Sequence, residues 1–308
     1  MAAARLRIIC GPTAAGKSAI ALELAERFAA SLVSADSRQI YRGFDIGTAK
    51  PTADQRGAAP HYGIDVADPT ERYSAARWAG EAQGWIEIAR AKGKEPVVVG
   101  GTGLYIKALV EPLFSPPPLE PARRGDLARE LEQMSIDELR RWCRELDPVR
   151  ARLGRTQLLR AIETVLLSGR RVSELHAAHK SDSRGRQPMY APSYLLIDPG
   201  TVLATRIETR IERMLAQGWR DEVAFLSREV PADAPAWKSS GYSVMRSVVR
   251  GELDLSIATE RVIIETRQYA KRQRTWFRHQ LPPAAVTRIN PDDPAARVVA
   301  REWWEKAE

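Results

Sequence analysis

The sequence contains little of what membrane, disulfide-rich or zinc-binding proteins require. It has two cysteines in 308 residues, Cys10 and Cys143, which are too few for a disulfide framework or a cysteine-based zinc site. No apolar run approaches the roughly 18–20 residues of a membrane span. The first ten residues lead directly into a glycine-rich segment and contain no cleavable apolar region. We therefore expect a cytoplasmic protein with no membrane partner.

Acidic residues are fewer than basic ones. The chain has 47 Lys and Arg against 39 Asp and Glu, a net charge of +8, and an isoelectric point of about 9.6. Between Arg261 and Leu281 there are six basic residues and a single acid, Glu265. This balance is consistent with a polyanionic partner such as nucleic acid, although many basic proteins bind none.

Short apolar runs alternate with longer helical patterns along most of the chain. The predicted strands are Leu6–Cys10, Leu32–Ala35, Pro96–Val99 and Tyr194–Ile197. The predicted helices between and after them are Ser18–Ala30, Ser74–Ala91 and Val202–Leu215. This alternation predicts an α/β fold, with a mainly parallel sheet and helices on both of its faces.

Two breaks interrupt the alternation and predict the domain organisation. Ser115–Pro118 contains three consecutive prolines, and Ser181–Pro192 is polar and rich in glycine and proline. The segment between them is Arg-rich and helical in pattern, with no predicted strand. We expect an α/β core at 1–118, an inserted all-helical domain at 119–186 that contacts RNA, and the rest of the core at 187–308 with a basic C-terminal helix.

The most specific motif follows the first predicted strand and opens the first predicted helix. Its residues are Gly11, Pro12, Thr13, Ala14, Ala15, Gly16, Lys17 and Ser18. They match G-x-x-x-x-G-K-[ST], the phosphate loop, in which backbone N–H groups and a helix N-terminus bind phosphate oxygens. Lys17 is expected to contact the terminal phosphate and Ser18 to ligate Mg²⁺. The motif alone leaves open which diphosphate is bound.

Two further strands are followed by segments expected at the same edge of the sheet. Asp36 follows Leu32–Ala35, and Thr102 lies in the glycine-rich segment after Val97–Val99. Ligands of such folds bind at the carboxyl ends of the strands. Asp36 would suit a metal site in a kinase or hydrolase, or a general base acting on an amine. The Thr102 hydroxyl would lie close to the ligand.

Two groups of basic residues share helix faces. One face of the predicted helix from Val202 carries Arg206, Arg210 and Arg213. These arginines could stabilise a departing phosphate, or Glu208 and Glu212 could neutralise them. A second predicted helix, at Thr266–Arg278, aligns Arg267, Lys271, Arg274 and Arg278. With no compensating acids on that face, it suits a nucleic-acid backbone or a solvated surface.

In their order along the chain, these segments resemble the tRNA dimethylallyltransferases (tRNA isopentenyltransferases) of the bacterial type. The matching segments are GPTAAGKS, SADSRQIYRGFDIGTAKP, PHYGID, VVVGGTGLYIKAL, RIETRIERML, GYSVM and TRQYAKRQRTWFR. The resemblance covers almost the whole chain and implies a P-loop NTPase-like fold. It implies an Mg²⁺-dependent enzyme that transfers a dimethylallyl group from dimethylallyl diphosphate to N6 of the adenosine immediately 3′ of a tRNA anticodon.

The resemblance also implies roles for individual residues. Asp36 would take the N6 proton, and Lys17, Arg210 and Ser18 with Mg²⁺ would stabilise the departing diphosphate. Thr102 would contact the target nucleotide, which must leave its base stack. The residues expected to contact the tRNA anticodon stem-loop are Asp36, Ser37, Arg38, Gln39, Thr102, Arg124, Gln157, Arg160, Lys271 and Arg274.

Three positions bear on how far the family pattern carries over. Ala15 stands where the family commonly has serine, and Leu158 stands where arginine usually follows Gln157. The RNA contact assigned to Arg124 could instead belong to Arg123. The zinc-finger extension of eukaryotic members is absent from this sequence, which favours a bacterial-type enzyme.

Three alternatives stay open at the level of sequence. An adenylate isopentenyltransferase would modify free AMP, ADP or ATP, but it needs neither the basic helix nor the helical insertion. A P-loop small-molecule kinase would use ATP as phosphoryl donor, and an RNA-binding protein could retain an inactive phosphate loop. No exposed apolar stripe is evident, so we expect a monomer with no obligate protein partner.

Overall fold

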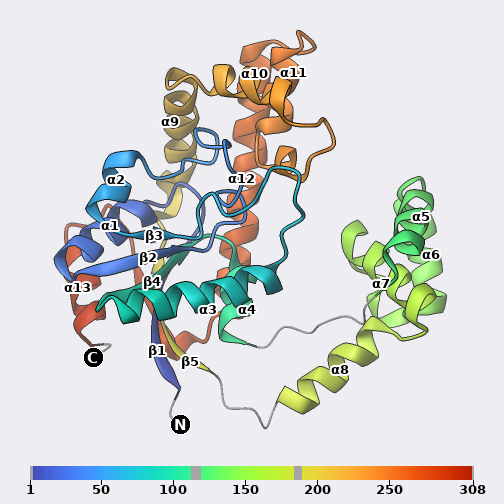
Figure 1. Cartoon of the computed structure of the whole chain (residues 1–308), viewed down its shortest axis with the longest axis horizontal. Helices are drawn as coiled ribbons and strands as arrows, with labels where there is room; N and C mark the ends of the chain where they lie inside the picture. The colour runs from blue at the N-terminus through green and yellow to red at the C-terminus, as the bar shows by residue number, and fades with distance from the viewer. Residues whose placement is uncertain (1–2, 112–118, 184–188, 307–308) are drawn as a thin grey trace. The chain divides into compact units, whose positions relative to one another are not determined.

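A computed structural model of the chain describes residues 3–111, 119–183 and 189–306. By the distribution of its contacts the chain divides into a core unit, residues 1–111 with 188–308, and a helical unit, residues 112–187. Both expected domain boundaries, after residues 118 and 186, fall at or within segments outside the described residues, as does the proline run. Figure 1 shows the elements of each unit, and each is described by itself.

The core unit contains a six-stranded sheet with the order β3-β2-β4-β1-β5-β6. Its strands are β1 (Ala4–Cys10), β2 (Ala30–Ser34), β3 (His61–Tyr62), β4 (Glu95–Gly100), β5 (Tyr190–Ile197) and β6 (Val286–Ile289). Every pairing among them is parallel. The predicted α/β fold is therefore confirmed. The edge strands β3 and β6 were not among the predicted strands, because each has no more than four residues.

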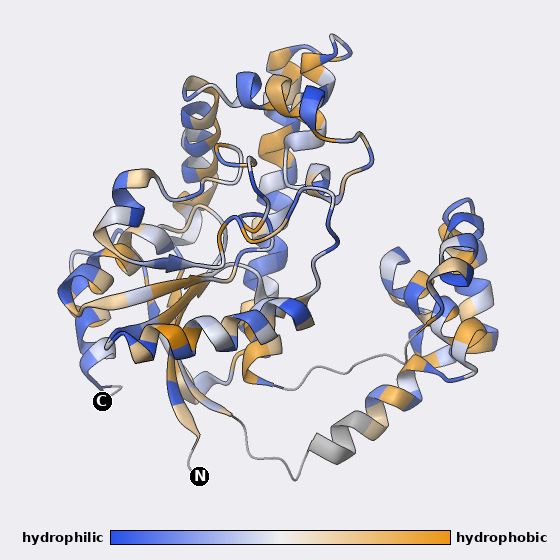
Figure 2. Ribbon diagram, viewed as in Figure 1, coloured by the Kyte–Doolittle hydropathy of each residue, from blue (hydrophilic) through white to orange (hydrophobic). Residues whose placement is uncertain are grey.

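Apolar side chains on both faces of the strands explain why this sheet is internal. Ile9, Leu32 and Leu195 belong to a buried cluster with Leu24 of α1 (Lys17–Arg27). Helix α13 (Ala296–Lys306) contributes two tryptophans to the same cluster. Successive side chains of a strand point to opposite faces, so Ile8 and Val98, both fully buried, face the other way. Figure 2 shows this apolar character of the central strands.

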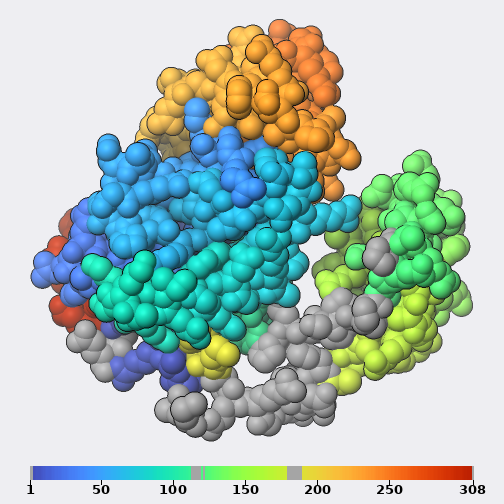
Figure 3. All heavy atoms as spheres, in the orientation of Figure 1, coloured from blue at the N-terminus to red at the C-terminus, as the bar shows by residue number. Residues whose placement is uncertain are grey.

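Helices α3 (Ala75–Ala91) and α4 (Gly103–Val110) pack against the second face of the sheet. Trp78 of α3 is fully buried, stacks on Tyr105 of α4 with ring centroids 4.9 Å apart, and donates a hydrogen bond to the Ser34 carbonyl oxygen. The space-filling view shows side chains of α3 covering this face of the core unit (Figure 3). The sheet is thus a central layer between two helical layers.

A further helical group lies beyond the carboxyl ends of the strands (Figure 1). It comprises α9 (Leu203–Ala216), α10 (Trp219–Glu229), α11 (Tyr242–Val249) and α12 (Leu255–Gln280). The short helix α2 (Ala53–Ala58) precedes β3. In the part of the chain that the structure describes, no helix combines the length and apolar character needed to cross a membrane.

The helical unit consists of α5 (Pro121–Glu132), α6 (Ile136–Leu146), α7 (Arg155–Ser168) and α8 (Val172–Ser183). A Ser135–Glu138 capping box starts α6. Leu139 and Leu158 are fully buried in a small core of this unit. The unit is all-helical within its described residues, as the sequence predicts.

Candidate active site

The phosphate loop occupies the turn between β1 and α1, at the carboxyl edge of the sheet. Gly11 has a φ of +148°, and a Cβ there would lie 2.2 Å from the Ile197 carbonyl oxygen. Gly16 has a φ of +91°, in the left-handed region. Both positions therefore require glycine. Ala15 is fully buried in the core cluster of the sheet, so its methyl group packs against apolar neighbours.

Lys17 lies inside this loop. Its ammonium group donates a hydrogen bond to the Pro12 carbonyl oxygen at 2.7 Å. Burial, the largest cause, lowers the pKa of Lys17 to about 8; the Asp36 carboxylate opposes this shift and Arg210 adds to it. The loop therefore presents a cation that has lost much of its hydration and that an incoming phosphate would stabilise.

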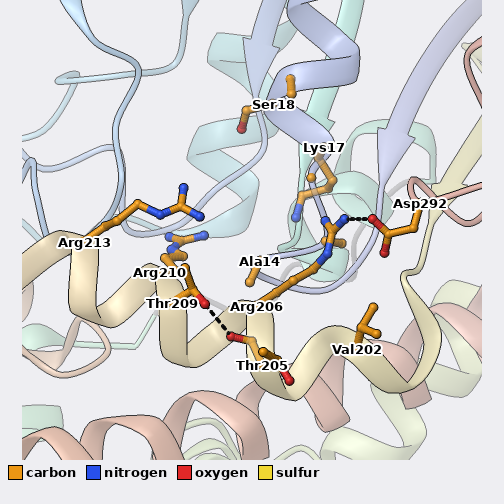
Figure 4. A pocket seen from close by; sticks show the side chains of 13 residues that line it. Ala14, Lys17, Ser18, Val202, Thr205, Arg206, Thr209, Arg210, Arg213 and Asp292 are labelled. Carbon is orange, nitrogen blue, oxygen red and sulfur yellow. Dashed lines mark hydrogen bonds and ion pairs between the residues drawn. The ribbon is translucent and has the colours of Figure 1, made fainter.

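Three arginines extend from α9 toward Lys17 and Ser18 (Figure 4). Together with the loop they line a cavity of about 730 Å³, here called the outer cavity, to which Asp292 also contributes. Arg206 is paired with Asp292. Burial lowers the pKa of Arg210, and the Asp36 carboxylate opposes this. Of the two glutamates that could neutralise this row, Glu208 pairs with Arg267 of α12 instead.

A second cavity of about 120 Å³, the inner cavity, shares three lining residues with the outer one. Lys17, Ser18 and Arg210 line both. The other polar residues of the inner cavity include Asp36, and its apolar residues include Leu22, Leu32 and Val99. Cations, a carboxylate and an apolar wall thus meet within a space of small-molecule size.

Asp36 is held at the carboxyl end of β2. Its Oδ1 accepts a hydrogen bond from the Arg38 backbone N–H at 2.9 Å. The Thr102 hydroxyl oxygen accepts one from the Ser37 N–H at 3.0 Å, and the Thr102 N–H donates to the Ala35 carbonyl oxygen at 3.1 Å. The Asp36 segment and the Thr102 segment are thereby joined, as their predicted positions at one edge of the sheet require.

Ser18 is the residue of this site that could ligate a magnesium ion. Ser18 is exposed at the start of α1 and lines both cavities. Within the described ranges no three His, Cys, Asp or Glu side chains form a metal cluster. The Ser18 hydroxyl would offer a cation one oxygen ligand of the hard type that Mg²⁺ prefers.

Comparison with known proteins identifies the family. A family model described as IPP transferase matches residues 39–280, and one described as isopentenyl transferase matches residues 4–58. This chain belongs to the IPP transferase family.

Relatives span nearly the full length of this IPP transferase. The tRNA dimethylallyltransferase of Cyanothece sp. is 39% identical over 295 residues, which cover 94% of this chain and 93% of that protein. The tRNA dimethylallyltransferase of Ralstonia pickettii is 40% identical over 312 residues, with 97% and 96% covered. The crystal structure of the tRNA isopentenylpyrophosphate transferase from Bacillus halodurans has a TM-score of 0.69 and 30% identity, covering 98% of this chain and 95% of that one.

The basic face of α12 differs from its expected form. Arg267 pairs with Glu208, and Arg274 pairs with Asp198 and also donates to the Gly200 carbonyl oxygen. The expectation that this face has no compensating acids is therefore wrong, because α9 and the segment after β5 supply them. Lys271 is exposed and is the better candidate for a phosphate contact.

Other residues expected to bind tRNA are partly engaged within the protein. The Gln39 amide accepts a hydrogen bond from the Ser34 hydroxyl at 2.9 Å and donates to the Ala49 carbonyl oxygen at 3.0 Å. Arg38 lines a small cavity that also contains Asp36 and Arg210. Gln39 itself lines the inner cavity, where these hydrogen bonds hold its amide.

The remaining RNA-binding candidates lie in the helical unit. Arg124 donates to Glu163 at 3.1 Å, and the Gln157 side chain accepts a hydrogen bond from the Gly154 N–H at the start of α7. Arg160 is exposed. Leu158, which stands where the family pattern has arginine, is fully buried in the core of the helical unit.

The sequence prediction missed two residues of the site on α12. Tyr269 and Gln273 line the inner cavity. The Tyr269 pKa is raised, chiefly by burial and then by the Asp36 carboxylate, while a hydrogen bond with Thr102 opposes this. Two sequence signals were their place in the segment TRQYAKRQRTWFR and their spacing of four residues, which puts both on one helix face.

Proposed function

We propose that this chain transfers a dimethylallyl group from dimethylallyl diphosphate to N6 of the adenosine immediately 3′ of a tRNA anticodon, and releases diphosphate. The observation that carries this proposal is the meeting of Lys17 and Arg210 with Asp36 at one small cavity with an apolar wall. The family and the printed names of its tRNA-modifying relatives support the same reaction.

The donor's two ends suit the two cavities. The outer cavity offers the phosphate-loop amides, Lys17 and the α9 arginines to a diphosphate. The inner cavity offers Leu22, Leu32 and Val99 to a five-carbon chain. The allylic carbon would then lie between them, near Asp36.

The reaction breaks the allylic C–O bond and forms a C–N bond. Lys17 and Arg210 stabilise the charge that develops on the departing diphosphate, and their poor hydration makes this stabilisation stronger than in water. A magnesium ion held by Ser18 would neutralise further phosphate charge. N6 of adenine is a weak nucleophile because its lone pair is delocalised into the ring; Asp36 takes the N6 proton as the new bond forms.

The acceptor must reach Asp36 from outside the core. A base in a stacked anticodon loop cannot do so, and we infer that the target adenosine flips out of its stack. Thr102 and Ser37 lie beside Asp36 for this nucleotide, while Lys271 of α12 and the exposed Arg160 of the helical unit would contact phosphates. We expect the enzyme to act as a monomer.

One competition experiment tests the proposal. The chain is incubated with Mg²⁺, dimethylallyl diphosphate, an anticodon stem-loop carrying adenosine 3′ of the anticodon, and free AMP, and both acceptors are followed by mass spectrometry. We expect one five-carbon unit on that adenosine and unmodified AMP. Modified AMP would indicate a nucleotide-level enzyme. No transfer, with ATP consumed in a parallel reaction, would indicate a kinase.

A further inference from the structure

Gln273 of α12 bridges two loops of the site. Its Oε1 accepts a hydrogen bond from the Thr13 N–H of the phosphate loop at 2.8 Å. Its Nε2 donates to the Gly101 carbonyl oxygen, next to Thr102, also at 2.8 Å. The residue is only 7% exposed. One buried amide thus joins the loop proposed to bind the donor to the segment proposed to face the acceptor.

The two hydrogen bonds require this side-chain chemistry. One partner is a donor and the other an acceptor, and a carboxamide offers both functions a fixed distance apart. A carboxylate would repel the Gly101 carbonyl oxygen, and an apolar side chain of the same length would leave both backbone groups without this partner. The orientation of the amide is also fixed, because a flip would bring N–H against N–H.

Residues of α12 also pack closely against the glycine-rich segment that contains Gly101 and Gly103. A Cβ on Gly101 would lie 2.4 Å from Gln273 Nε2, and a Cβ on Gly103 would lie 2.3 Å from the Trp276 ring. Tyr269 interacts with Thr102 between them. Residues 269, 273 and 276 share one helix face, and the segment is glycine-rich where the helix approaches it most closely.

We propose that Gln273 is a positioning residue that sets the separation between the phosphate loop and the Gly101–Thr102 segment. This inference rests on the proposed function, which assigns donor and acceptor to these two segments. Transfer requires reacting atoms about 3–3.5 Å apart, and an error of about 1 Å can cost about 100-fold in rate. A bridge that fixes the two loops therefore acts on the rate of transfer more than on the affinity for either substrate.

The first test is Gln273→Met, with Gln268→Met as the matched control. Gln268 is exposed on the same helix. Transfer to the stem-loop is measured for the native chain and both variants. We expect the kcat of Gln273→Met to fall by about 10–100-fold, with KM values for both substrates within about threefold of native and Gln268→Met unchanged. A merely structural role would lower the unfolding temperature but leave the kcat of the folded enzyme intact.

The possible outcomes separate the two proposals. A native chain that does not modify the stem-loop would overturn the proposed function and this assignment with it. An active native chain whose kcat is matched by Gln273→Met would overturn this assignment alone. A loss confined to KM would also overturn it, because Gln273 would then act in substrate binding.

A second test uses the close approach of Gly101. In Gly101→Ala the new methyl group displaces the Gln273 amide, and we expect kcat to fall. In the Gln273→Ala background the contact with the amide is gone and the Gly11 carbonyl oxygen, 3.3 Å from the new methyl group, is the remaining close neighbour, so adding Gly101→Ala should cost less than it does in the native chain. If the fold-decrease in kcat of the double variant equals the product of the two single fold-decreases, the two residues act independently. That result would overturn the proposal that Gln273 positions the two segments.

Discussion

Arg206 of α9 forms an ion pair with Asp292 at the rim of the outer cavity. Asp292 is exposed and follows β6. Its carboxylate pairs with the Arg206 guanidinium in the cavity where the donor's diphosphate is proposed to bind. We therefore expect the pair to compete with the ligand.

Asp292→Asn should tighten the binding of inorganic diphosphate. The substitution removes one negative charge from the rim and frees Arg206. Because the pair is solvent-accessible, the gain is modest, about two- to fivefold in Kd. Isothermal titration calorimetry at low salt measures it, with Asp293→Asn as the neighbouring control. Weaker binding in Asp292→Asn would mean that the carboxylate orients Arg206 for the ligand.

Asp36→Ala should abolish most of the transfer while leaving RNA binding nearly intact. Loss of a general base costs about 10²–10⁴ in turnover. Single-turnover transfer measures the rate, and fluorescence anisotropy measures stem-loop affinity. Asp54→Ala, which removes an exposed carboxylate on α2, is the control. A variant that keeps its rate but loses affinity would place Asp36 in RNA binding alone.

The affinity for diphosphate should fall as pH rises through about 8, where Lys17 loses its charge. Lys17→Arg keeps its charge across this range, so the ratio of the two affinities cancels the titration of diphosphate itself. We expect the affinity of Lys17→Arg for diphosphate, divided by that of the native chain, to rise between pH 6.5 and 9.5. Calorimetry measures both affinities. A constant ratio would contradict the role of Lys17.

The same pKa has a consequence for stability with a defined sign. The folded-state pKa of Lys17 lies below its usual value of 10.5. Between pH 8 and 10.5 the unfolded chain therefore binds more protons, and Lys17 makes the free energy of unfolding increase with pH across this window.

Lys271→Ala should weaken stem-loop binding and flatten its salt dependence. Each lost phosphate contact lowers the slope of log K against log salt by about 0.7–0.9. Arg274→Ala should have a smaller effect, because Arg274 is already paired with Asp198. Lys92→Ala, an exposed lysine that precedes β4, serves as control. An unchanged slope for Lys271→Ala would make this face of α12 a solvated surface.

Leu158→Arg should destabilise the helical unit, although arginine is the residue that the family commonly has there. Leu158 is fully buried, and an unpaired buried charge costs about 3–5 kcal/mol. Leu166→Arg, at a position 42% exposed on the same helix, should have little effect. Hydrogen exchange of the α7 amides reports both. Equal protection in the two variants would contradict the assignment of Leu158 to the core.

The features predicted correctly from the sequence are those that depend on residues close together along the chain. The phosphate loop lies where its motif places it, because a strand, a glycine turn and a helix follow one another within a short stretch. The strands β1, β2, β4 and β5 were found from their apolar runs. Strands β3 and β6 were missed, because two and four residues give no usable pattern.

What the sequence could not predict is pairing between distant segments. Arg274 is neutralised by Asp198 and Arg267 by Glu208, from other elements of the fold. A helical-wheel argument sees only charges within one helix. The role of Gln273 was missed for the same reason. Its hydrogen-bond partners are backbone groups of two distant loops, and the sequence does not show where such groups lie in space.

The position of β5 next to β1 also governs how the chain assembles. Gly11 is seated against the Ile197 carbonyl oxygen, and β1 pairs with β5 along its whole length. The residues between β1 and β5, which include the helical unit, are synthesised before β5 leaves the ribosome. Contacts this distant in sequence form slowly, and domains fold as units during synthesis. The helical unit can therefore acquire its shape on the nascent chain, while the phosphate loop is completed only after the ribosome has passed residue 197.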